Sequence, residues 1–176
     1  PDQVTLPPHL PDTEGMRETL ARYYNAVARM DAALGQRLRE LDEDGLRDDT
    51  IVLYYSDHAS PLPRSKRFCY DDGLRVPLVV RVPERWRHLL PETPGSRIAA
   101  PVSLVDLVPS LAALAGCEPP EGAQGQSFLS ATRRERTYAF AGRDRMDERY
   151  DLTRAVRSER YRYIRNYAPH RPWGQH

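Results

Sequence analysis

Apolar positions along the chain follow two spacings, which predict a long helix and several short strands. Between Thr13 and Gly45 the apolar residues recur every three or four positions. This period predicts one amphipathic helix that Thr13 caps and Gly45 ends. Its apolar stripe contains Tyr23, Tyr24 and Met30, and we expect these side chains in a core.

Two continuous apolar runs predict strands that are covered on both faces. Residues 50–55 and 78–82 are rich in β-branched and aromatic side chains. A helix from Ser103 to Leu114 is predicted after the second strand, because Ser103 and Asp106 have the spacing of a capping box. Pro109 is expected to kink this helix or to shorten its first turn.

This order of elements predicts an α/β fold, a sandwich with a mainly parallel sheet, over residues 1–132. The remaining residues, 133–176, predict a small antiparallel C-terminal subdomain. Its expected strands are 137–140, 153–157 and 161–167, with a turn at 158–160.

Composition changes this picture mainly through the distribution of charge. The 176 residues are 40% hydrophobic and 29% charged, which is typical of a globular protein, and the apolar runs are too short to cross a bilayer. The net charge of +1 conceals −5 over residues 1–50 and +6 over residues 133–176, which hold 12 arginines and 6 acids. An anionic ligand is therefore expected near the C-terminal segment.

Asp57 and His58 are the first candidates for chemistry. They follow the first predicted strand directly, and ligands bind at the carboxyl ends of strands in open α/β sheets. A carboxylate and an imidazole that converge there can ligate one metal ion. The alternative is an aspartate that ends a strand, followed by a histidine in a turn, and the pair alone leaves both interpretations open.

A basic loop follows this pair, with Arg64, Lys66 and Arg67 in close succession. Such a loop is usually a solvated surface. Next to a metal at a strand end, however, cationic side chains form a site for a tetrahedral oxyanion such as sulfate or phosphate.

Residues 50–58 and 66–78 together resemble the sulfatase family of the alkaline phosphatase superfamily. The resemblance continues in the same order over most of the chain, through residues 23–35, 101–116, 125–129 and 143–151. It implies an alkaline phosphatase-like fold that is incomplete in this chain, and a periplasmic or secreted protein.

The resemblance also implies roles for individual residues. Asp57 and His58 occupy the places of two ligands of a divalent cation, which is usually calcium in the family. An imidazole also suits manganese or zinc. Lys66 occupies the place of the lysine that contacts the sulfate group. One departure is Ala59, which stands where the family usually has a glycine.

The family's nucleophile is a cysteine in a Cys-x-Pro-Ser/Ala-x-Arg context that is matured to formylglycine, and it is absent here. Cys117 is followed by Glu-Pro-Pro and lacks the small residue and the arginine, while Cys69 has no such context. Both cysteines are interpreted as structural. We expect the formylglycine and a further acidic pair of metal ligands in a missing N-terminal part, and we expect this chain alone to be inactive.

Arg143, Asp144 and Arg145 alternate in sign, which usually marks a solvated face or an ion-pair network. Near a sulfate site, these residues and Arg64 could instead bind the sugar or the acidic groups of a glycan.

The leading hypothesis is therefore a sulfatase that hydrolyses a sulfate ester or sulfamate on a sugar or aryl group. Its partner is a small sulfated substrate or a sulfated glycan, with no nucleic acid and no membrane span, and no oligomeric state is indicated. One alternative is a phosphodiesterase or phosphonate monoester hydrolase of the same superfamily. Another is a non-catalytic polyanion-binding module, in which Tyr161, Tyr163 and Tyr167 alternate with arginines.

Overall fold

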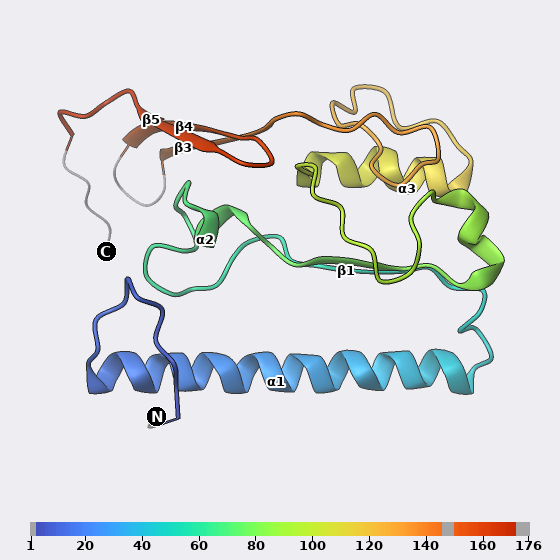
Figure 1. The fold of residues 1–176 in the computed structure, drawn as a ribbon, viewed down its shortest axis with the longest axis horizontal. Helices are drawn as coiled ribbons and strands as arrows, with labels where there is room; N and C mark the ends of the chain where they lie inside the picture. Colours follow the sequence, from blue (N-terminus) through green and yellow to red (C-terminus); the bar gives the residue numbers. More distant parts are fainter. Residues whose placement is uncertain (1–2, 146–149, 172–176) are drawn as a thin grey trace. The chain divides into compact units, whose positions relative to one another are not determined.

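A computed structural model describes residues 3–145 and 150–171 (Figure 1). The chain divides into two compact units, residues 1–52 and 53–176, which are described separately below. The predicted domain boundary between residues 132 and 133 stays a prediction. Within the described residues, no helix is both long enough and apolar enough to span a membrane.

The first unit is dominated by helix α1, which covers Glu14–Glu43. The Thr13 hydroxyl accepts a hydrogen bond from the Met16 amide at 3.3 Å and so caps the first turn. After the helix, Gly45 adopts a left-handed φ of 70° that costs a glycine little. The predicted helix and both of its end signals are confirmed.

The expectation that the apolar stripe of α1 is buried is wrong for most of its length. Among the described residues of this helix only Leu20 is buried, whereas Tyr23 is half-buried and Tyr24 and Met30 are exposed. Apolar residues spaced by three and four positions give a helix an apolar face that can pack. The side chains of that face become buried only where a second apolar surface lies against them.

Two adjacent strands follow, β1 (Val52–Tyr55), which starts at the last residue of the first unit, and β2 (Leu78–Arg81) of the second unit. A short helix, α2 (Asp71–Leu74), lies between them in sequence. Both predicted strands are therefore confirmed. Neither is covered on both faces, since Tyr55 and Val79 are exposed. Two strands provide too little sheet to bury continuous apolar runs from both sides.

A 3-10 helix, η1 (Glu84–Leu89), follows β2, and a second one, η2 (Leu104–Asp106), leads directly into helix α3 (Leu107–Ala115). The helix ends at Gly116 in a left-handed conformation with a φ of 68°. Pro109 lies in the first turn of α3, where its missing amide N–H breaks no intrahelical hydrogen bond. The helix predicted from Ser103 to Leu114 is thus present as η2 followed by α3, and the predicted effect of Pro109 stays a prediction.

The C-terminal residues form an antiparallel sheet of three strands in the order β3 (Ala139–Arg145), β4 (Tyr150–Arg157) and β5 (Arg162–Asn166). The hairpin between β4 and β5 turns as predicted, with the Ser158 amide donating to the Tyr161 carbonyl at 2.8 Å. One face carries the buried Thr153 and Ala155, and Tyr163 is exposed on the other. Strand β3 begins at residue 139, two residues after the predicted start of the 137–140 strand, and reaches Arg145.

Candidate metal and anion site

Asp57 and His58 lie immediately after the end of β1, as the sequence predicts. Both side chains are accessible, and Asp57 Oδ1 lies 3.7 Å from His58 Nε2. The Ser56 hydroxyl donates to the His58 carbonyl at 2.7 Å and holds this turn. One carboxylate oxygen and one imidazole nitrogen therefore face the same small region of space.

The His58 ring is oriented by the backbone. Its Nδ1 lies 2.8 Å from the Ala59 carbonyl oxygen. Because a carbonyl can only accept, Nδ1 is the donor in this contact, and in the neutral imidazole the lone pair then lies on Nε2. A histidine that ligates a metal typically donates its other ring nitrogen in this manner.

The turn is made without a left-handed residue at Ala59, which is buried. In the described part of the chain, the non-glycine residues with a positive φ are Arg64 at 63° and Arg67 at 79°. Backbone strain in this region therefore falls on the basic loop and not on the position where the family usually has a glycine.

The basic loop closes on itself around Ser65. The Lys66 amide donates to the Ser60 carbonyl at 3.0 Å, and the buried Ser65 hydroxyl lies 2.9 Å from the Ser60 hydroxyl. Ser65 also donates to the Asp72 carbonyl. With Ser65 anchored inside, its neighbours Arg64 and Lys66 are left exposed.

Arg64 and Arg143, two of the residues predicted to bind substrate, each lie over an aromatic ring. Arg64 lies over the Tyr70 ring at 4.8 Å. Arg143 is 7% exposed and lies 5.1 Å from the centre of the Phe68 ring. These two side chains thus contact aromatic rings of the segment that follows Lys66.

Asp144 binds Arg154 through both of its oxygens, at 2.8 and 3.2 Å. This hydrogen-bonded carboxylate raises the pKa of the Arg154 guanidinium. Arg145 is exposed at the end of β3. Binding of substrate by Arg64, Arg143, Asp144 and Arg145 stays a prediction.

Neither cysteine has the surroundings of an activated nucleophile. Cys69 is buried, and burial raises the pKa of its thiol, which disfavours the reactive thiolate. Cys117 is exposed just after α3, where its amide donates to the Ala112 carbonyl at 3.0 Å.

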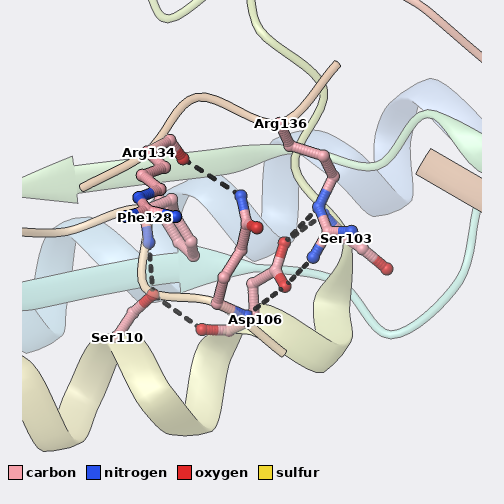
Figure 2. Close-up of polar contacts among 7 residues, drawn as sticks. Ser103, Asp106, Ser110, Phe128, Arg134 and Arg136 are labelled. Atoms are coloured by element: carbon pink, nitrogen blue, oxygen red, sulfur yellow. Dashed lines mark hydrogen bonds and ion pairs between the residues drawn. The ribbon is translucent and has the colours of Figure 1, made fainter. Parts of the chain in front are cut away.

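A second polar centre is built around Asp106 (Figure 2). The Asp106 carboxylate is buried and accepts hydrogen bonds from the Ser103 amide at 3.0 Å and the Gln126 amide at 2.9 Å. Arg136 binds the same carboxylate with Nε and Nη2. The half of the capping box in which Asp106 accepts from Ser103 was predictable, but the arginine lies 30 residues further along the chain.

Figure 2 also shows Ser110 joining α3 to the segment after Gln126, with its hydroxyl donating to the Asp106 carbonyl at 2.6 Å and accepting from the Phe128 amide at 3.0 Å. Gly125 allows this close approach, because a Cβ there would lie 2.2 Å from the Val105 carbonyl oxygen. These contacts make residues 103–136 one connected structure.

A carboxylate and an imidazole 3.7 Å apart have the chemistry of two ligands of one divalent cation, and this role of Asp57 and His58 stays a prediction. Over residues 3–145 and 150–171, no group of three or more histidine, cysteine or acidic side chains is arranged to hold a metal ion. Two accessible donors fall short of the four to eight ligands that zinc, manganese or calcium take.

Comparison with known proteins gives two family profiles that overlap along the chain. A profile described as "Sulfatase" matches residues 5–117. A second, described as "N-sulphoglucosamine sulphohydrolase, C-terminal", matches residues 64–175. Together they cover almost the whole sequence in the order in which the elements were described.

Two curated relatives match nearly the entire chain. An ulvan-active sulfatase from Formosa agariphila is 41% identical over 168 residues, which are 95% of this chain and 27% of the relative. The human N-sulphoglucosamine sulphohydrolase is 30% identical over 174 residues, which are 94% of this chain and 34% of the relative. The chain thus spans about a quarter to a third of the length of these relatives.

A solved structure is also similar, that of BT4656 in complex with its substrate D-glucosamine-2-N,6-O-disulfate. It matches with a TM-score of 0.69 and 26% identity, and the match covers 81% of this chain and 30% of the other. The likeness confirms the predicted fold class, an α/β sandwich with a small antiparallel subdomain.

Proposed function

Because the chain belongs to the sulfatase family, we propose that the protein containing it hydrolyses a sulfate ester or sulfamate. A sulfated sugar is the favoured substrate class. The human relative is named for N-sulphoglucosamine, and the similar solved structure holds its substrate D-glucosamine-2-N,6-O-disulfate. Aryl sulfates are the simplest probes of the same reaction. By the same membership we propose a periplasmic or secreted location, which cell fractionation would test.

The observation that carries this proposal is the closure of one short loop behind the carboxyl end of β1. Asp57 and His58 begin the loop, and the hydrogen bond from the Lys66 amide to the Ser60 carbonyl returns the chain toward them. This hydrogen bond places the backbone of Lys66 beside that of Ser60, two residues after His58.

This arrangement suits a sulfuryl group, whose oxygens carry the charge during attack and departure. The Lys66 ammonium is a compact donor that can contact one of these oxygens and stabilise that charge. Asp57 and His58 would hold two coordination positions of the divalent cation, with the His58 ring fixed by its bond to Ala59. When bound, such a cation polarises an oxygen of the substrate as a Lewis acid.

Hydrolysis of a phosphate ester is the second candidate, and the imidazole of His58 favours it. An imidazole ligand suits manganese or zinc better than calcium. Matched aryl sulfate and aryl phosphate substrates, assayed on the whole protein with calcium, manganese or zinc added, separate the two. Faster turnover of the sulfate supports the proposal, and faster turnover of the phosphate contradicts it.

The chain by itself is expected to bind divalent cations only weakly. Asp57 and His58 supply two donors, and both are accessible to competing water. Calorimetric titration of the 176-residue chain with calcium or manganese should give a Kd weaker than about 10⁻⁴ M, as for the weakest natural calcium sites. Binding in the micromolar range would mean that the chain holds a complete site.

The chain alone is also expected to show no multiple turnover of an aryl sulfate. A covalent mechanism needs an attacking group, and neither the buried Cys69 nor Cys117 has the surroundings to provide one. Release of the phenol, followed by absorbance over many enzyme equivalents, measures this directly. Sustained turnover that a Cys69→Ala or Cys117→Ala variant abolishes would contradict the prediction.

A further inference from the structure

Two arginines lie directly opposite each other in the C-terminal sheet. Arg157 of β4 and Arg162 of β5 are register partners, and like charges in this position repel. Asp71 lies between them, with its Oδ1 2.5 Å from Arg162 Nη1 and 3.7 Å from Arg157 Nε. This carboxylate, 91 residues before Arg162 in the chain, relieves the repulsion of the pair.

Asp71 follows Lys66 by five positions, in a segment whose neighbouring residues make close backbone contacts. The Ser65 hydroxyl donates to the Asp72 carbonyl, and the Phe68 amide donates to the Ser65 carbonyl at 3.1 Å. Gly73 lies so close that a Cβ there would be 2.1 Å from the Phe68 carbonyl oxygen. These contacts surround both residues, so we expect a displacement of Asp71 to reach the backbone that carries Lys66.

A second contact joins the same segment to the sheet. The guanidinium of Arg143 on β3 lies over Phe68, whose ring stacks on Tyr70 with centres 5.8 Å apart and planes at 11°. Arg64 lies over the other ring of this pair, 4.8 Å from the centre of Tyr70. The resulting column orders the segment beside Lys66, but its contacts are cation–π and stacking interactions, each weaker than a charge-assisted hydrogen bond.

We propose that Asp71 is a positioning residue for Lys66: its ion pairs with Arg162 and Arg157 fix residues 64–74 against the C-terminal sheet and thereby fix the place of the Lys66 ammonium. The inference rests on the proposed function, because it takes Lys66 as the group that contacts the sulfuryl oxygens. It gives the C-terminal sheet a part in the reaction without any contact with the substrate.

Asp71→Asn tests this in the whole protein with an aryl sulfate substrate. Small displacements of a catalytic group are costly, and kcat is expected to fall on the order of tenfold with little change in KM. The matched control is Asp12→Asn, which breaks the ion pair between Asp12 and Arg17 in the first unit and should leave both constants unchanged. A wild-type kcat in Asp71→Asn would overturn the proposal.

The double variant Asp71→Asn/Lys66→Ala separates positioning from a general loss of structure. If Asp71 acts through Lys66, the double variant is no slower than Lys66→Ala alone. Losses that multiply would overturn the positioning role. If Lys66→Ala alone keeps full activity, the proposed contact of Lys66 with the sulfuryl oxygens is wrong. This outcome differs from a failure of the Asp71 proposal, in which Lys66→Ala is slow but Asp71→Asn is not.

Limited trypsin digestion gives a readout besides activity. Arg64, Lys66 and Arg67 are exposed cleavage sites in the segment that Asp71 fixes. Asp71→Asn should speed cleavage there several-fold, because local opening becomes more populated. Exchanging the charges in Asp71→Arg/Arg162→Asp should return the cleavage after Arg64, Lys66 and Arg67 toward the wild-type rate, with each bond followed separately by mass spectrometry because residue 71 becomes a trypsin site itself. An unchanged rate in Asp71→Asn, or no recovery in the exchanged variant, would count against the proposal.

Discussion

Replacing Lys66 by alanine is expected to lower kcat/KM for a sulfate ester by about 100-fold in the whole protein. This corresponds to about 3 kcal/mol, the usual loss when one preorganised donor is removed from developing charge. Lys66→Arg should recover only part of the activity, because a planar guanidinium needs more room and approaches an oxygen differently. Steady-state kinetics on one aryl sulfate measure all three enzymes.

Arg67→Ala is the control for this prediction. Arg67 is exposed and follows Lys66 directly, so it shares the charge of the loop, but adjacent side chains cannot both point at one oxygen. Its loss should change kcat/KM only slightly. Equal and small effects of Lys66→Ala and Arg67→Ala would show that Lys66 is only a solvated charge.

Replacing Asp106 by asparagine is expected to destabilise the chain by about 3 kcal/mol. The carboxylate accepts from Ser103, Gln126 and Arg136, and the side chain of Arg136 is itself largely buried. An amide nitrogen would replace one of these acceptors, and the guanidinium would lose the charge that offsets its desolvation. Denaturant unfolding, monitored by circular dichroism, gives the change in free energy.

Asp42→Asn provides the comparison for Asp106. Its ion pair with Arg47, at 3.3 Å, joins two exposed side chains. Pairs of this kind contribute less than about 1 kcal/mol. If the two variants unfold at the same denaturant concentration, the Asp106 network does not stabilise the fold.

The sequence predicted the elements whose signals are local. Thr13 and Gly45 bound α1, Gly116 ends α3, and the β4–β5 hairpin turns at Ser158 as expected. Each signal depends on a residue and its nearest neighbours, such as a hydroxyl that caps a turn or a glycine that takes a positive φ. Burial was predicted less well, because the exposure of Tyr24 or Val79 depends on surfaces that periodicity does not identify.

Candidate site residues could be named from the sequence only where they are close together along the chain. Asp57, His58 and Lys66 were proposed from their position after a strand and from the family resemblance, and their roles stay predictions. Asp71 was not proposed, because its contact with Arg162 spans 91 residues and nothing in either local pattern pairs them. Ion pairs between distant elements depend on how those elements pack, and a single sequence does not contain that information.

The left-handed backbone at Arg64 and Arg67 has a consequence for the evolution of this loop. A side chain in that conformation costs about 1 kcal/mol or more relative to glycine, so selection for stability alone would favour glycine at both positions. Arginine kept at these positions in relatives would indicate selection for the guanidinium that outweighs its cost in stability. Glycine at these positions in relatives would indicate that the guanidinium is not needed. The residue types found at these two positions in relatives therefore show whether the positive charge is conserved or only the left-handed backbone conformation.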